Sequence, residues 1–418
     1  MRRFQSFVFW ALWLVVWSVA PVGAQQLESF EKAEEVPVAR LNARMERVFG
    51  ASAPAKFTRP VILLKIRYRS RDERDKPVTL SGLLALPAGG APRGLVMWHH
   101  GTFVERALAP SQLKFGARPN ENEAAILAFA SGGTAVAMPD YLGYGAHTGV
   151  HPYPLAEENS RSALDFLAPC RAVAAKLKIP LASPVRLCGY SEGAAVAMWT
   201  ARRLQERGQK PAASALMAGP YDLAGVTRQS LLLPTQDTPT FIARLYLLAF
   251  TAYSWSKSRG DKLTDFFRPA MASAISSSFD AARSSGLRDQ DIVTQLAVTS
   301  FFMNARGSMK PLLTPQFYAL LSNPNARGPI MTALRRNDAY HWTPQSPILL
   351  WTLDSDTLVV PQNTRLALRE FRRRGVTSRL VRAQIAHSRL NHITALAPSL
   401  LIARRFFDRG FAGVPNAR

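Results

Sequence analysis

Cysteine is scarce in this sequence. Its 418 residues include only Cys170 and Cys188, so the chain can form at most one disulfide. Cys188 lies on a predicted strand and Cys170 on a predicted helix. The two residues could form a disulfide, which would require an oxidising compartment, or they could remain buried free thiols. Both alternatives stay open.

Acidic side chains are also few, at 29 against 52 Lys and Arg, which gives a formal charge of +23. The basic residues are scattered, and the runs at 372–374 and 404–405 fall on predicted helices, as on solvated helix faces. Because no nucleic-acid-binding motif accompanies them, we expect no nucleic-acid partner. The charge favours solubility and electrostatic association with an anionic cell envelope.

The ligand spacing of a zinc site is missing as well. Four histidines occur in the first half of the chain, namely His99, His100, His147 and His151, but none belongs to such a pattern. We therefore expect no metal. The segment "HTGVHPYP", which carries two of them, is predicted to be a loop near the rim of a pocket.

Long apolar runs are absent except at the N-terminus. There, "MRRF" precedes the apolar run "FVFWALWLVVWSVA", and "VGA" at 22–24 supplies small residues for cleavage. This pattern predicts a signal peptide over 1–24, with an uncleaved membrane anchor as the alternative. No cysteine follows the run, which argues against a lipoprotein anchor. We expect an exported protein that begins near Gln25 and is periplasmic or extracellular.

The rest of the chain has the pattern of an α/β protein. Residues 25–58 are expected to be a polar lead-in with one short helix, and "VILLKIRYRS" and "VTLSGLLALP" to form a β-hairpin. From residue 94, short apolar strands alternate with helices, which indicates a mostly parallel sheet covered on both faces. The predicted strands are 94–100, 134–140, 185–191, 213–222, 347–356 and 378–387, and the predicted helices are 157–176, 193–206, 362–374 and 393–408.

This alternation stops over residues 225–345, where the sequence is helical. An insertion there would lie over the carboxyl ends of the strands, where open α/β sheets bind ligands. We interpret it as a helical cap or lid that divides the core into 59–224 and 346–412. A separate helical domain is the alternative.

The motif "GYSEG" at 189–193 predicts a nucleophile. A serine hydroxyl reacts only when a base removes its proton and a rigid turn exposes it. Gly-x-Ser-x-Gly between a strand and a helix forms such a turn, and bulk at the flanking positions would clash there. Ser191 is therefore the candidate nucleophile.

An acid and then a histidine should follow the nucleophile along the chain. Asp356, in "WTLDSDTLVVP", is the preferred acid, and Asp354 is the alternative. His392, just before the last predicted helix, is the preferred base, and His387 is the alternative.

Backbone amides should stabilise the oxyanion. We expect one N–H from Glu192 and another from Thr102 or a neighbour in "WHHGTFVER". A carboxylate near an oxyanion is unfavourable, so the Glu192 side chain should point away. Asp140 and Tyr141 could contact substrate, although Asp140 is better explained as a residue that fixes its own loop.

Together, "HHGT", "MPDYLGYG", "CGYSEG", "LDSDTLVVP" and "NHITA" resemble the α/β-hydrolase superfamily, and most closely its secretory lipase and esterase branch. The acid motif departs from the usual pattern, because Leu353 stands where glycine is common. The resemblance implies an α/β-hydrolase fold and hydrolysis of a small-molecule or lipid-like ester through an acyl-enzyme, with no cofactor. A serine peptidase of the aminopeptidase type and a non-catalytic envelope-binding protein are the alternatives.

Overall fold

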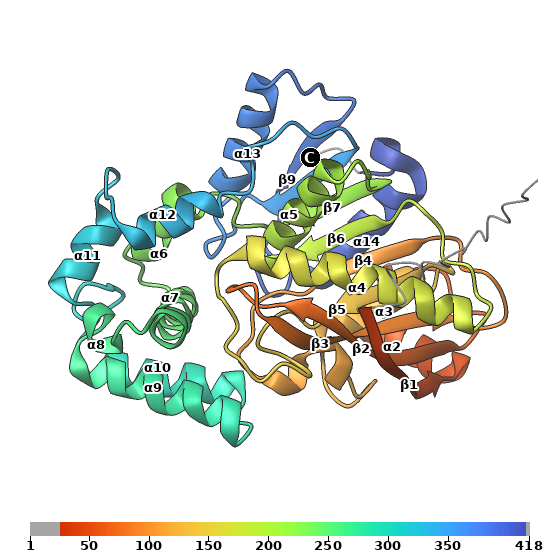
Figure 1. Ribbon diagram of the computed structural model, residues 1–418. Helices are drawn as coiled ribbons and strands as arrows, with labels where there is room; N and C mark the ends of the chain where they lie inside the picture. The colour runs from red at the N-terminus through yellow and green to blue at the C-terminus, as the bar shows by residue number, and fades with distance from the viewer. Residues whose placement is uncertain (1–25, 415–418) are drawn as a thin grey trace, which may run out of the picture.

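The computed structural model describes residues 26–414, so the predicted signal peptide lies outside the described residues. Within that range, nine strands form a single sheet in the order β1-β2-β3-β5-β4-β6-β7-β8-β9 (Figure 1). The strands are β1 Leu27–Val36, β2 Val61–Arg71, β3 Pro77–Pro87, β4 Leu95–His99, β5 Ala135–Pro139, β6 Arg186–Tyr190, β7 Ala213–Met217, β8 Ile348–Leu353 and β9 Val381–Ala386.

The sheet is antiparallel at one edge and parallel elsewhere. β1, β2, β3 and β5 pair antiparallel, whereas β5, β4, β6, β7, β8 and β9 run parallel. The parallel strands are short, and β4, β5 and β8 are buried at every residue, as strands covered on both faces should be. The predicted α/β class and mostly parallel sheet are confirmed.

The N-terminal segment differs from the predicted lead-in with one short helix. β1 precedes the helix α2 (Val38–Phe49) and extends the sheet by pairing with β2. This edge strand buries only Val36 fully, so its sequence carries no apolar alternation from which a strand could be predicted.

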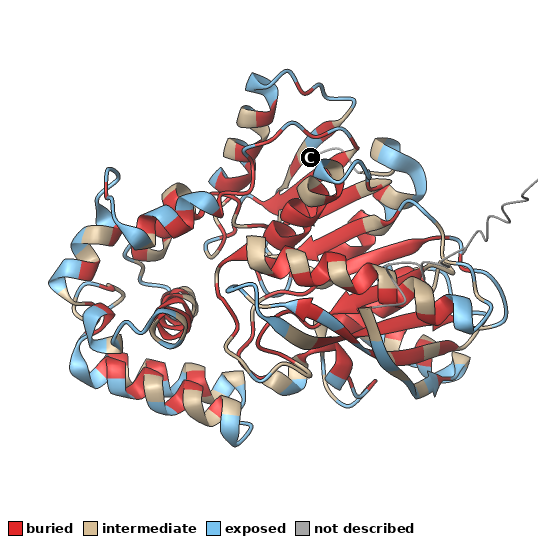
Figure 2. Ribbon diagram, in the orientation of Figure 1, coloured by how far each residue is buried: buried red, intermediate tan, exposed pale blue. Residues whose placement is uncertain are grey.

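Helices cover both faces of the sheet (Figure 1). On one face α4 (Ala156–Lys176), α5 (Glu192–Glu206) and α13 (Gln362–Arg373) share a buried apolar cluster with the strands. On the other, α2, α3 (Glu121–Ala130) and α14 (Leu396–Arg409) share a second cluster. Figure 2 shows the strands between these layers as the most continuously buried part of the molecule.

The helix α3 was not predicted from the sequence. Nine of its ten residues are buried, so no polar face gives it a helical period. Asn120 caps the helix by accepting a hydrogen bond from the N–H of Asn122 at 2.7 Å.

Seven α-helices lie between β7 and β8 and project to one side of the sheet (Figure 1). They are α6 Arg228–Leu232, α7 Thr238–Arg259, α8 Leu263–Phe266, α9 Pro269–Ser284, α10 Asp289–Phe302, α11 Pro315–Ser322 and α12 Pro329–Arg336. We call this segment the cap. Its apolar cluster also includes Val104 and Tyr153 from loops of the core, so the cap packs on the core.

Cys170 and Cys188 are buried free thiols, which decides against the disulfide. Across residues 26–414, no helix has the length and apolar character needed to cross a bilayer.

Candidate active site

Ser191 lies on a sharp turn between β6 and α5. Its backbone has φ 55° and ψ −125°, a conformation that costs free energy for any residue with a side chain. A Cβ at Gly189 would lie 2.1 Å from the carbonyl oxygen of Gly193, and one at Gly193 would lie 2.0 Å from that of His99. Both glycines of the motif are therefore required by the close approach of strand and helix, as the sequence predicted.

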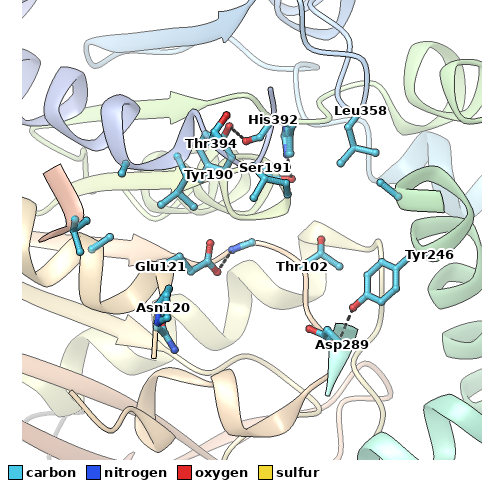
Figure 3. Close-up of a pocket in the computed structure, with 18 of the residues that line it drawn as sticks. Thr102, Asn120, Glu121, Tyr190, Ser191, Tyr246, Asp289, Leu358, His392 and Thr394 are labelled. Carbon is cyan, nitrogen blue, oxygen red and sulfur yellow. Dashed lines mark hydrogen bonds between the residues drawn. The ribbon is translucent and has the colours of Figure 1, made fainter. Parts of the chain in front are cut away.

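The structure brings Ser191, His392 and Asp356 into one hydrogen-bonded chain, of which Figure 3 shows Ser191 and His392. Nε2 of His392 lies 2.9 Å from Oγ of Ser191, and its Nδ1 lies 2.7 Å from Oδ2 of Asp356. Asp356 follows β8, and His392 lies in the loop between β9 and α14. The second carboxylate oxygen of Asp356 accepts hydrogen bonds from the N–H groups of Leu358 and Val359 at 3.0 and 2.9 Å.

The alternative acid and base, Asp354 and His387, hydrogen-bond to each other instead. Their side chains are 34% and 67% exposed, against 0% for Asp356 and 6% for His392. The hydrogen bond from His387 lowers the pKa of Asp354. The geometry therefore favours the preferred pair over the alternatives.

Tyr190 is a site residue that sequence reasoning missed. Its hydroxyl donates a hydrogen bond to the backbone carbonyl of His392, and the two rings lie 5.1 Å apart. The residue before the nucleophile thus helps to fix the loop of the candidate base. Its position next to Ser191 in the motif was the only available signal.

The loop after β4 was predicted to contain the second oxyanion donor, and it lies beside Ser191. Gly101 and Thr102 line the same cavity as Ser191, and no acceptor among the described residues takes the backbone N–H of Thr102. Glu192 is the first residue of α5, so its N–H has no acceptor within the helix. Both N–H groups are therefore free to bind an oxyanion.

Glu121 holds this loop and was also missed. Its Oε1 accepts a hydrogen bond from the N–H of Gly101 at 2.8 Å (Figure 3). Burial raises the pKa of its carboxyl from 4.5 to about 7, although the hydrogen bond from Gly101 acts in the opposite direction. Its helix was not predicted, so the sequence offered no reason to place it here.

The Glu192 carboxylate is buried and bonded on both oxygens. Oε1 lies 2.7 Å from Nε2 of His151, and Oε2 accepts a hydrogen bond from Oγ1 of Thr102 at 2.9 Å. His151 is 2% exposed, whereas Tyr153 and Pro154 of the same loop line a cavity that reaches Ser191. Contacts with aromatic rings and the hydrogen bond to Glu192 hold the imidazole in the interior of the protein.

The other candidates have structural roles. Asp140 accepts hydrogen bonds from Oγ of Ser81 at 2.5 Å and the N–H of Ser111 at 2.8 Å, which fixes its loop. Asp140 and Tyr141 are fully buried and line neither cavity at Ser191. Burial lowers the pKa of His99 and of His100 to about 4. Residues 26–414 contain no cluster of three or more side chains that could bind a metal.

Two cavities meet at Ser191. The larger, about 720 Å³, extends toward α2 and α3, and most of its lining surface is apolar (Figure 3). Its polar residues include Arg44, Arg47, Asn120, Glu121 and Asp289. The smaller, about 50 Å³, extends under the cap and is mostly apolar; its lining includes Leu223, Leu248, Trp255, Phe317, Leu321 and Leu334.

Comparisons with known proteins agree with this architecture. The family model "Thioesterase domain" matches residues 150–252, which include Ser191. No curated protein matches the chain. A putative hydrolase from Legionella pneumophila is similar in structure, with 23% identity over 92% of this chain and 98% of that one, and a TM-score of 0.77.

Two enzymes are also similar in structure. The rice cell wall degrading esterase LipA from Xanthomonas oryzae is 22% identical over 92% of this chain and 98% of its own, with a TM-score of 0.70. Lipase A from Candida antarctica is 15% identical over 94% and 83%, with a TM-score of 0.62. At these identities, the likeness establishes a shared fold.

Proposed function

We propose that this chain, whose fold is that of the α/β-hydrolases, is an exported serine hydrolase that cleaves carboxylic esters through an acyl-enzyme. One observation carries the proposal: an unbroken hydrogen-bonded chain runs from Asp356 through His392 to Ser191, and the serine faces a cavity. The known activities of the two structurally similar enzymes, an esterase and a lipase, support an ester as the substrate.

In the proposed reaction, Oγ of Ser191 attacks the ester carbonyl carbon while Nε2 of His392 takes the hydroxyl proton. The carbonyl oxygen becomes an oxyanion and accepts hydrogen bonds from the N–H groups of Glu192 and Thr102. The imidazolium then protonates the departing alcohol, and Asp356 stabilises it through Nδ1. Water, activated by the same histidine, releases the acid.

The cavities indicate how an ester would be divided at Ser191. The larger cavity, about 720 Å³, suits an acyl chain or an aromatic acid, because its volume is that of a small-molecule site and most of its lining surface is apolar. The cavity under the cap, about 50 Å³, has room only for a small group, such as a short alcohol portion. In this proposal the cap serves as the lid of the site.

The proposed reaction needs no metal or cofactor. Export, to the periplasm or beyond, rests on the N-terminal sequence, and the net charge of +23 would favour an anionic envelope.

The Ser191→Ala variant tests the proposal. Hydrolysis of short p-nitrophenyl esters should fall to background, while circular dichroism shows an unchanged fold. Normal turnover by the alanine variant would exclude Ser191 as the nucleophile. A panel of esters and amides then separates an esterase from a serine peptidase.

A further inference from the structure

A buried acid–histidine pair adjoins the proposed nucleophile without being part of the triad. Glu192 is 3% exposed and His151 is 2% exposed, and Nε2 of the imidazole lies 2.7 Å from Oε1 of the carboxylate. A buried charge is costly unless it is paired and hydrogen-bonded. The protonation of this pair therefore matters to the site beside it.

The hydrogen bonds of His151 require two protons on the pair. Nδ1 lies 2.9 Å from the carbonyl oxygen of Leu142, and a carbonyl oxygen can only accept, so Nδ1 carries a proton. The contact between Nε2 and Glu192 joins two atoms that would both be acceptors if the imidazole were neutral and the carboxyl ionised. A second proton must lie between them, and the pair is neutral overall.

The surroundings place this second proton on the histidine. Aromatic rings pack around the imidazole, and the two nearest lie within the distance of about 6 Å over which a ring can stabilise a cation. Their centroids lie 4.8 Å (Tyr144), 5.8 Å (Phe250), 6.2 Å (Tyr141) and 6.3 Å (Tyr153) from that of His151. Glu192 also accepts hydrogen bonds from Thr102 at 2.9 Å and Nδ2 of Asn159 at 3.4 Å, which favour its ionised form.

We propose that His151 is an imidazolium paired with the Glu192 carboxylate, and that this pair fixes the oxyanion loop through the hydrogen bond between Glu192 and Thr102. The inference rests on the proposed function, because it assigns Thr102 to the oxyanion hole. Glu192 and His151 act here as positioning residues, through Thr102.

The pair resolves a difficulty that the sequence raised. An unpaired carboxylate next to the nucleophile would oppose the negative charge that develops on the oxyanion, whereas a neutral pair opposes it far less. The pair also joins the site to the cap: Oγ of Ser254, on α7, donates to the backbone carbonyl of His151 at 2.7 Å, and Phe250 of the same helix contacts the ring. The position of α7 is thereby linked to that of the oxyanion loop.

The protonation state is tested by NMR of the full-length protein with ¹⁵N-labelled histidine. The spectrum near neutral pH should show protons on both ring nitrogens of His151. The signals of His151 are assigned by their disappearance in His151→Leu. If that variant does not fold, the double variant His151→Leu/Glu192→Gln serves for the assignment. A single protonated nitrogen on His151 overturns the proposal. This experiment requires no turnover, so its outcome is independent of whether Ser191→Ala abolishes hydrolysis.

The positioning role is tested with His151→Leu, Glu192→Gln and the double variant. His151→Leu leaves a buried carboxylate unpaired, which should lower Tm by about 5–10 °C. It should also lower kcat roughly 10²-fold with KM little changed, because a displaced oxyanion donor acts on the transition state. In Glu192→Gln, the amide can donate to a neutral His151 and accept from Thr102, so its losses should be several-fold smaller.

The decisive quantity is the non-additivity. His151→Leu should cost much less Tm and kcat in the Glu192→Gln background than alone, because no buried charge is then left unpaired. Equal losses in both backgrounds indicate a packing role only and overturn the proposal. If His151→Leu alone does not fold, a folded double variant still shows the coupling, and a double variant that also fails contradicts it. His341→Leu, at an exposed histidine, is the matched control and should leave both readouts unchanged.

Discussion

Replacing Asp356 by Asn changes the proposed triad by one functional group. Oδ1 of Asp356 is held by the N–H groups of Leu358 and Val359 at 3.0 and 2.9 Å. These donors will retain the amide oxygen of Asn, so that its NH₂ faces Nδ1 of His392. Because NH₂ can only donate, the imidazole must carry its proton on Nε2, where it can no longer accept the proton of Ser191.

The expected loss in kcat/KM of Asp356→Asn is roughly 10⁴-fold, equivalent to about 5.5 kcal/mol of transition-state stabilisation. The assay is steady-state hydrolysis of a p-nitrophenyl ester, with circular dichroism to confirm folding. Asp354→Asn is the matched control, because this carboxylate forms a pair with His387 at the surface, where such pairs contribute little. Its rate should stay within about twofold of wild type. A large loss in Asp354→Asn, with activity retained in Asp356→Asn, would refute the assignment.

Three further predictions concern stability, substrate and thiols. Burial raises the pKa of Glu121 from 4.5 to about 7, so the folded state binds a proton that the unfolded state releases between these values. Its contribution to stability, roughly 1–3 kcal/mol, is therefore present below about pH 4.5 and is lost as the pH rises through 7. Glu121→Gln should raise Tm at pH 8 but not at pH 4. Equal changes in Tm at both pH values would contradict this prediction. In a chain-length series of p-nitrophenyl esters, medium or long acyl chains should be turned over. Activity confined to acetyl and propionyl esters would argue against the larger cavity, about 720 Å³, as the acyl site. Burial raises the pKa of Cys170 and of Cys188, so a thiol reagent should leave the native protein unmodified, and rapid labelling would contradict their burial. Because both thiols are free, a reductant should leave Tm unchanged.

The sequence predicts the central sheet well because its strands are short, continuous apolar runs between helices. The nucleophile turn was predictable for a related reason: the spacing of Gly189 and Gly193 reflects local backbone contacts. β1 and α3 were missed because one is a polar edge strand and the other is buried on all sides. Neither shows the alternation of apolar and polar residues on which such predictions depend.

The candidate site was predictable where chain order constrains it and not where side chains from distant segments meet. Asp356 and His392 follow Ser191 in the expected order, although only coordinates could separate them from Asp354 and His387. The contact between His151 and Glu192 joins residues 41 positions apart through the packing of aromatic rings. No motif records that contact, and the sequence predicted only that the segment with His151 is a loop near a pocket.

Reaction with a fluorophosphonate, followed by intact mass and peptide mapping, tests the central claim most directly. An activated serine hydroxyl attacks phosphorus and retains the phosphonyl group, whereas an ordinary serine does not react. We predict one adduct per chain, located on Ser191, which disappears in Ser191→Ala and forms much more slowly in His392→Ala but not in His387→Ala. A folded protein that gains no adduct, or gains it at another residue, would contradict the proposed nucleophile.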